Sequence, residues 1–248
     1  MIKIKRTSWR RIFLFDVDGT LTPPRTPMTP EFASLFRGFV KTNYVYLVSG
    51  SDISKIREQI PEDILRECKG IFGSSANEFW IDDKKQYENV FVPSQEIVTE
   101  LERLLLESNY KGRTNNHIEY RPGMINFSIL GRSANKEQRH DYARWDKRMQ
   151  ERKRMAVNLM TKYPEIDVKV GGEISIDIYP WGLDKSQAVE FIRETHPTDT
   201  IAFFGDRTDE DGNDYSVVKV MDENDIVHAV ENYEDTYTVL KEYIGGRL

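Results

Sequence analysis

A short apolar run that ends in two carboxylates limits the folds open to this chain of 248 residues. Residues 12–15 lead directly into Asp16-Val17-Asp18-Gly19, a pattern typical of a buried strand that stops at a turn. A second apolar run at 44–48 follows a predicted helix, which has Thr29 as its cap and Pro30 as its first residue. This order of strand, helix and strand predicts parallel strands with right-handed crossovers. We therefore expect an α/β fold with a doubly wound, Rossmann-like parallel sheet.

This alternation of predicted strands and helices stops in the middle of the chain and resumes after Asp184. The middle section is predicted to hold a polar hairpin at 79–92, strand pairs at 118–130 and 166–179, a helix at 94–108 and a long charged helix at 135–162. Antiparallel strands with helices on one face form an α+β unit. We therefore predict a discontinuous core of residues 1–82 and 183–248, which carries an inserted α+β cap of residues 83–182.

Composition excludes several classes of function. The net charge of −6 argues against a nucleic-acid partner. A single cysteine, Cys68, allows no intramolecular disulfide and makes a cysteine-based zinc site unexpected. The apolar run after the basic residues 3–11 is too short for a signal peptide, and no run reaches the roughly 20 residues that span a bilayer. We therefore expect a cytoplasmic protein with no membrane partner.

The strongest chemical signal is the pair of carboxylates Asp16 and Asp18, because ligands of open parallel sheets bind beyond the carboxyl ends of the strands. Asp16 could attack a phosphorus atom, and Asp18 could give a proton to the leaving oxygen and later take one back. The alternative is a plain strand-end turn, since Asp-Gly is a common turn pair. Asp206 and Asp214 follow another predicted strand, so Mg²⁺ could be held by Asp16, Asp18, Asp206 and Asp214.

Two further segments favour a bound phosphoryl group. Lys185, at a predicted helix start, could neutralise both that group and Asp16, although a lysine there is more often a surface residue. Ser49, Gly50 and Ser51 offer hydroxyls and amides just before a predicted helix, where a phosphate is favoured. The alternative for this segment is a routine helix cap.

These motifs, taken together, resemble the haloacid dehalogenase superfamily of phosphoryl-transfer enzymes, above all the Asp-x-Asp-Gly-Thr-Leu-Thr motif of residues 16–22. The segments 119–126, 131–133 and 171–177, with Arg139, look like the cap motifs of eukaryotic-type phosphomannomutases in the same order. This resemblance implies a phosphomannomutase that needs Mg²⁺ and a hexose 1,6-bisphosphate activator. It also implies hexose phosphates as substrates and a homodimer formed through the caps.

The resemblance assigns roles to eight residues. Three cap arginines would clamp the phosphate that is not reacting, two polar residues would contact sugar hydroxyls, two others would line the site, and an arginine of the core would meet the substrate. In that order these are Arg121, Arg132 and Arg139, then Ser175 and Asp177, then Met124 and Asn126, and finally Arg25. The planar fork of arginine suits bidentate phosphate binding better than lysine does.

Three functions remain open at this point. The first is a phosphomutase that passes a phosphoryl group between Asp16 and a sugar. The second is a sugar-phosphate phosphatase that uses the same Asp16 and Asp18, because Ser49 matches a phosphate-binding hydroxyl that is common in phosphatases of the superfamily. The third is a phosphoacceptor or binding module without enzymatic activity, which leaves a cap of about 100 residues unexplained.

Overall fold

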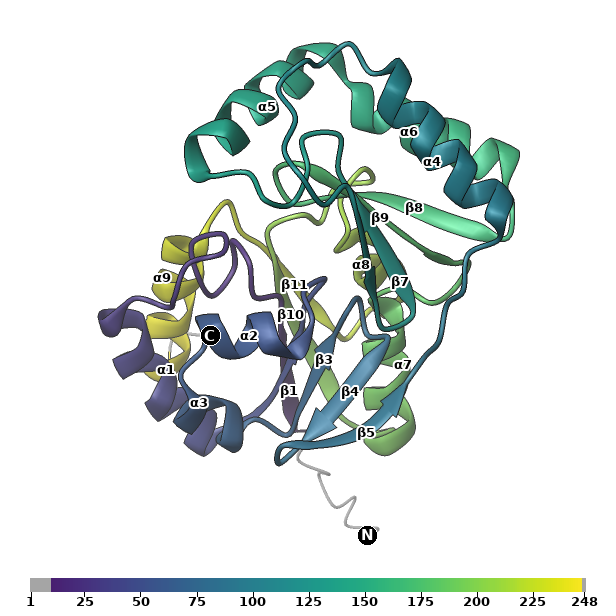
Figure 1. The fold of residues 1–248 in the computed structure, drawn as a ribbon. Helices are drawn as coiled ribbons and strands as arrows, with labels where there is room; N and C mark the ends of the chain where they lie inside the picture. Colours follow the sequence, from purple (N-terminus) through teal and green to yellow (C-terminus); the bar gives the residue numbers. More distant parts are fainter. Residues whose placement is uncertain (1–9, 247–248) are drawn as a thin grey trace, which may run out of the picture.

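The computed structural model describes residues 10–246, which form two β-sheets with helices packed against them (Figure 1). The larger sheet has the strand order β11-β10-β1-β2-β3-β4-β5, and the smaller has the order β6-β7-β9-β8. The strands are β1 (Arg11–Phe15), β2 (Tyr44–Val48), β3 (Gly70–Gly73), β4 (Glu78–Ile81), β5 (Lys84–Glu88), β6 (Ile118–Arg121), β7 (Met124–Phe127), β8 (Ile166–Gly171), β9 (Ser175–Pro180), β10 (Thr200–Gly205) and β11 (Ile226–Ala229). The helices are α1 (Pro30–Thr42), α2 (Ile53–Gln59), α3 (Glu62–Glu67), α4 (Gln95–Glu107), α5 (Lys136–Met149), α6 (Glu151–Lys162), α7 (Ser186–Thr195), α8 (Tyr215–Val220) and α9 (Tyr233–Ile244).

Strand β1 lies inside the larger sheet and is covered on both faces. Phe13 and Phe15 point to one face, where they pack in a cluster with α1 and α9. Ile12 and Leu14 point to the other face and pack against α7 and α8. This alternation is the period of two that a strand imposes on its side chains. The two covered faces explain why the sequence of β1 is continuously apolar.

The strands from β11 to β3 are parallel, which confirms the predicted α/β fold. Their carboxyl ends lie at one edge of the sheet, so Asp16 after β1, Ser49 after β2 and Asp206 after β10 share that edge. Strands β4 and β5 extend the sheet in antiparallel fashion. Residues 84–88 thus pair within the larger sheet, although the predicted core segment ended at residue 82. The division into core and cap stays a prediction.

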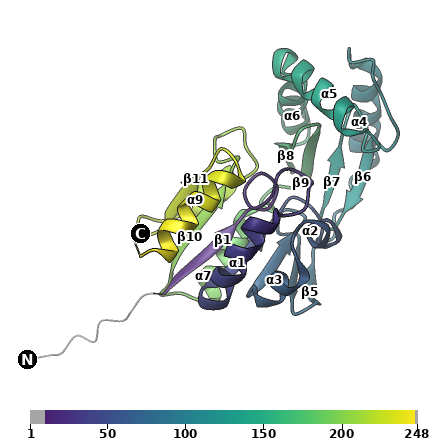
Figure 2. The same cartoon turned by 90° about the vertical axis from the view of Figure 1, so that its left-hand side faces the viewer.

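The smaller sheet is antiparallel throughout and carries α4, α5 and α6 on the face that is turned away from the larger sheet (Figures 1 and 2). Apolar side chains of the three helices and the four strands form its own core, which includes Leu101, Phe127, Leu159 and Ile176. The other face of this sheet is turned toward the carboxyl edge of the larger sheet (Figure 1). We call this smaller unit the cap.

The predicted single helix at 135–162 is wrong, because it is divided into α5 and α6 at Gln150. The backbone of Gln150 adopts a left-handed conformation with φ 52°. Asp146, buried near the end of α5, accepts hydrogen bonds from both the backbone N–H and the Nε of Arg152. These bonds hold the first turn of α6 at the break. Helical periodicity continues across the break, so the sequence pattern did not reveal it.

Across residues 10–246, no helix combines the length and the apolar character that a membrane span requires.

Candidate active site

A buried ion-pair network stands at the carboxyl end of β1. Lys185 Nζ lies 2.6 Å from Asp16 Oδ1 and 2.6 Å from Asp214 Oδ1, and all three side chains are almost fully buried. Burial lowers the pKa of Lys185, but the two carboxylates outweigh burial and raise it above its usual value, so the lysine is protonated. Burial also raises the pKa of Asp16 well above its usual value, and Lys185 opposes this rise. Lys185 therefore favours the anionic form of Asp16, the form that can act as a nucleophile.

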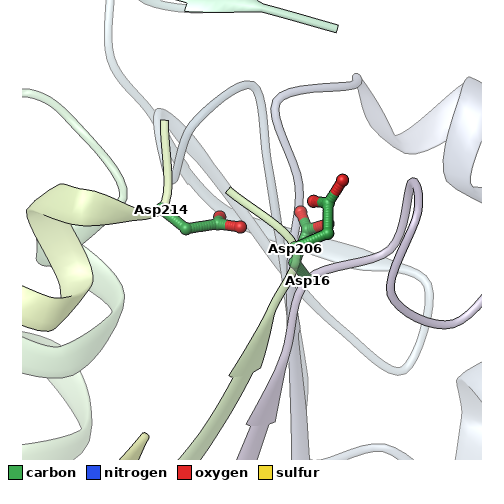
Figure 3. A group of neighbouring side chains, drawn as sticks. All are labelled: Asp16, Asp206 and Asp214. Carbon is green, nitrogen blue, oxygen red and sulfur yellow. The ribbon is translucent and has the colours of Figure 1, made fainter. Parts of the chain in front are cut away.

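Three carboxylates gather at this point, as Figure 3 shows. Oxygens of Asp16, Asp206 and Asp214 lie within 4.8 Å of one another. Burial, together with repulsion from Asp214, raises the pKa of Asp206 to about 7. One lysine does not balance three carboxylates, and an oxygen-only ligand set suits Mg²⁺. The donor set therefore fits a divalent cation, which would relieve the repulsion.

The carboxylate of Asp18 lies outside this group and is held by three donors. Its Oδ1 accepts hydrogen bonds from the backbone N–H of Arg25 at 2.8 Å and from Nε2 of Gln59 at 2.8 Å. Its Oδ2 accepts one from Oγ of Ser51 at 3.2 Å. These contacts aim Asp18 independently of Asp16, in keeping with separate roles for the two residues. The predicted coordination of a metal by Asp18 stays a prediction.

A cavity of about 200 Å³ lies between the carboxyl edge of the larger sheet and the cap. The predicted site residues that line it are Asp16, Asp18, Arg25, Ser49, Gly50, Ser51, Arg121, Asn126, Arg139, Ser175, Asp177 and Asp206. Residues far apart in the sequence, from the core and from the cap, thus face the same space. Lys185 and Asp214 stand behind Asp16 and do not line the cavity.

Arg121 joins the cap to the core at the edge of the cavity. Its Nη1 donates to the backbone oxygen of Gly50 at 2.9 Å, and its Nε donates to Glu119 at 2.7 Å. The second oxygen of Glu119 accepts from Nε of Arg132 at 2.9 Å. Arg132 is held by this bond and does not line the cavity, so its predicted contact with a phosphate stays a prediction.

Three polar side chains of β7 and β9 form a connected group on the cap side of the cavity. Nδ2 of Asn126 donates to Oγ of Ser175 at 3.0 Å and to Oδ1 of Asp177 at 2.5 Å. Burial raises the pKa of Asp177, while Arg121 and Asn126 oppose this rise. The buried Oδ1 of Asn126 has no hydrogen-bond partner among the described residues. A buried acceptor without a donor is costly, so a ligand hydroxyl is a suitable partner for it.

Arg139 lies in α5, with its guanidinium at the cavity. Its side chain donates to the backbone oxygens of Ala134 and Arg132 at 3.2 and 3.4 Å. Burial, followed by repulsion from Arg25, lowers the pKa of Arg139 to about 10. The residue therefore keeps its charge at neutral pH. Two arginines that approach each other in this way favour an anion between them.

Met124 is not among the residues that line the cavity, so its predicted place beside the substrate stays a prediction. It is fully buried at the start of β7. The neighbouring Gly123 has φ 60° and packs so tightly against Asn77 that a Cβ there would come within 2.5 Å of the Asn77 side chain. The turn before β7 therefore packs closely against Asn77 of the larger sheet's unit.

Other residues at the site were missed by the sequence analysis. Glu173, Arg207 and Asn213 line the cavity, and Gln59 holds Asp18. Arg207 follows Asp206 directly, so its place near the sheet edge could have been expected. Gln59 lies 41 residues from Asp18, and no local pattern links the two.

Comparisons with known protein sequences identify the family of this chain. The family model described as eukaryotic phosphomannomutase matches residues 32–245. The chain is 32% identical to the phosphomannomutase of Schizosaccharomyces pombe, over 94% of this chain and 93% of that protein. It is 33% identical to the phosphomannomutase of Drosophila melanogaster, over 94% of this chain and 95% of that protein.

Solved structures support the fold alone. The C-terminal domain of trehalose-6-phosphate phosphatase from C. albicans superimposes with a TM-score of 0.64 at 17% identity, over 97% of this chain and 93% of that one. An IMP-nucleotidase of Plasmodium falciparum gives a TM-score of 0.63 at 13% identity, over 96% of this chain and 68% of that one. The expected haloacid dehalogenase-type fold is confirmed. From its sequence and its fold, the chain belongs to the eukaryotic phosphomannomutase family.

Proposed function

We propose that this protein interconverts mannose 1-phosphate and mannose 6-phosphate, by way of a phosphoryl group carried on Asp16. The observation that carries the proposal is the shared cavity. Asp16 and Asp18 line this cavity together with Arg121 and Arg139 of the cap, which supports Asp16 as the nucleophile and Asp18 as the acid–base group. A molecule with a phosphate at each end can engage both sides of such a cavity.

In the first step, an Asp16 oxygen attacks a phosphorus atom of a hexose 1,6-bisphosphate. The bond between that oxygen and phosphorus forms as the bond between phosphorus and the sugar oxygen breaks. Lys185 already occupies Oδ1 of Asp16, while Oδ2 accepts no hydrogen bond within residues 10–246, so Oδ2 is the attacking atom. Asp18 gives its proton to the departing sugar oxygen.

In the second step the phosphoryl group passes in the opposite direction, from Asp16 to a hexose monophosphate. Asp18 takes the proton of the sugar hydroxyl, and this oxygen attacks the phosphorus on Asp16. The other phosphate of the sugar rests against Arg139 and Arg121, and this binding aligns the reacting end. Asn126, Ser175 and Asp177 offer donors and acceptors to the sugar hydroxyls between the two ends.

The proposal includes a divalent cation, a bisphosphate activator and a location. Asp16, Asp206 and Asp214 would hold Mg²⁺, which would neutralise charge on the phosphoryl group in transfer. A hexose 1,6-bisphosphate would load Asp16 at the start. We further propose that the protein is cytoplasmic and forms a homodimer through its caps, as the family resemblance implies.

A coupled assay tests the proposal. Mannose 1-phosphate is supplied with Mg²⁺, with and without glucose 1,6-bisphosphate, and both mannose 6-phosphate and free phosphate are followed. The expected result is mannose 6-phosphate that depends on the bisphosphate and is lost in Asp16→Asn. Glu210→Gln is a matched control, because it removes an exposed carboxylate from the segment between β10 and α8, and Glu210 does not line the cavity.

Free phosphate alone, also lost in Asp16→Asn, would replace this proposal with a sugar-phosphate phosphatase. Ser49 motivates this second candidate, because its buried hydroxyl lines the cavity beside Asp16. Cap closure would then fail to keep water from the phosphoryl group on Asp16.

A further inference from the structure

Glu173 adds a carboxylate to the cap side of the cavity, where Arg121 and Arg139 favour an anion. It belongs to the turn between β8 and β9 and lines the cavity next to Arg139. Its side chain is 36% exposed. Its negative charge raises the pKa of Arg139 against the larger effects of burial and of Arg25.

Hydrogen bonds from Arg152 of α6 hold the turn that carries Glu173. Nη1 of Arg152 donates to the backbone oxygens of Gly171, Gly172 and Ser175 at 3.3, 3.0 and 3.2 Å. Nε of Arg152 is in turn held by Asp146 at 2.7 Å. The backbone on both sides of Glu173 is thereby preorganised beside the cavity.

The two glutamates near the cap arginines are not equivalent. Glu119 accepts hydrogen bonds from Arg121 and Arg132, so its charge is paired. The carboxylate of Glu173 accepts no hydrogen bond from any residue within 10–246, and the nearest side-chain nitrogen recorded for it is Nε2 of His140 at 3.6 Å. Its negative charge therefore remains open to the cavity.

We propose that Glu173 is a specificity-determining residue that weakens the hold of the cap on the remote phosphate of the sugar. This inference rests on the proposed function, since it assigns the Arg139 end of the cavity to the phosphate that is not reacting. The mutase cycle needs such a limit, because a bisphosphate bound too tightly at both ends could not turn around within the site. Repulsion by Glu173 offsets part of the attraction that Arg25, Arg121 and Arg139 exert.

The size of the effect follows from Coulomb's law. A unit charge and a phosphate dianion about 8 Å apart, at a dielectric constant near that of water, repel by an energy worth roughly sixfold in affinity. Water reaches Glu173, which justifies the high dielectric constant. Removal of this charge is therefore expected to tighten phosphate binding by about three- to tenfold.

The test is an equilibrium binding experiment with Glu173→Gln. Calorimetry measures the dissociation constants of mannose 6-phosphate and of unphosphorylated mannose, without Mg²⁺ and without bisphosphate, so that no phosphoryl transfer takes place. Glu165→Gln is the control, because it makes the same change of charge on an exposed cap residue that does not line the cavity. Glu173→Ala serves as a second variant should the glutamine variant fold poorly.

The expected result is a dissociation constant for mannose 6-phosphate that falls about three- to tenfold in Glu173→Gln and stays unchanged in Glu165→Gln. The gain should shrink at about 0.5 M salt, where charges are screened within a few ångströms. Unchanged or weaker binding of mannose 6-phosphate would overturn the inference. Equal changes for mannose and mannose 6-phosphate would also overturn it, since they indicate a hydroxyl contact. Tighter binding without mutase turnover would contradict the proposed function alone.

Discussion

Replacement of Lys185 by methionine tests how the acidic cluster is held together. Methionine keeps most of the length of the lysine side chain but removes its charge. Asp16 and Asp214 each lose a 2.6 Å ion pair, and three carboxylates remain within 4.8 Å of one another without a cation. Loss of one partner of a buried ion pair lowers stability by about 3–5 kcal/mol. We expect a loss of this size at pH 8 in the absence of divalent metal.

The loss should depend on pH in a defined direction. Without Lys185, the pKa values of the buried carboxylates rise further, so the folded state binds more protons than the unfolded state between about pH 4 and those raised values. The stability of the variant therefore falls as the pH rises through this window. The difference from the parent protein should be smaller at pH 5 than at pH 8, because protonation relieves the repulsion at pH 5.

Urea unfolding of the metal-free protein, followed by circular dichroism, gives both free energies. Lys153→Met is the matched control, because the ion pair of Lys153 with Asp211 is just as short but has both side chains half exposed. It should cost no more than about 1 kcal/mol. A loss below about 1 kcal/mol for Lys185→Met at pH 8, or one equal to the control, would show that Lys185 does not hold the acidic cluster together.

Three further predictions concern other sites. Burial raises the pKa of Cys68 to about 12, so a thiol reagent at pH 8 should react with it at least about 100-fold faster in denaturant than in the folded protein. Arg103 and Lys162 hold the pKa of Glu100 at about 2, so Glu100 adds stability that is present above its unfolded pKa and is lost as the pH falls toward 2. The midpoint of thermal unfolding of Glu100→Gln should not show this dependence on pH. Arg139→Ala should raise KM for mannose 1-phosphate about 10-fold or more, and equal KM values would contradict the clamp.

The sequence was a good guide wherever one local pattern decided the structure. The run before Asp16 ended a strand as expected, and Thr29 caps α1 with its side chain as expected. The parallel core followed from the order of strands and helices, because right-handed crossovers leave few other arrangements. The carboxyl edge of that sheet then placed Asp16, Ser49 and Asp206 together.

The sequence was a poor guide wherever the structure depends on contacts between distant segments. The hydrogen bond from Arg121 to the Gly50 oxygen joins residues 71 positions apart. The pairing of β5 with β4 places β5 in the larger sheet, and the sequence alone does not show which strand β5 pairs with. The break at Gln150 is another case, since it depends on the buried contact between Asp146 and Arg152. Glu173 was predicted only as part of a motif, because its importance depends on Arg139, which reaches the same cavity from a distant part of the sequence.

Chemical trapping can show whether Asp16 carries the phosphoryl group. The protein is mixed with glucose 1,6-bisphosphate and Mg²⁺, quenched, and treated with borohydride, which reduces an acyl phosphate of aspartate to homoserine. Mass spectrometry of the peptide then locates the change. We expect homoserine at position 16 and no such conversion at Asp18, Asp206 or Asp214. An unmodified Asp16 in protein that still forms mannose 6-phosphate would contradict it.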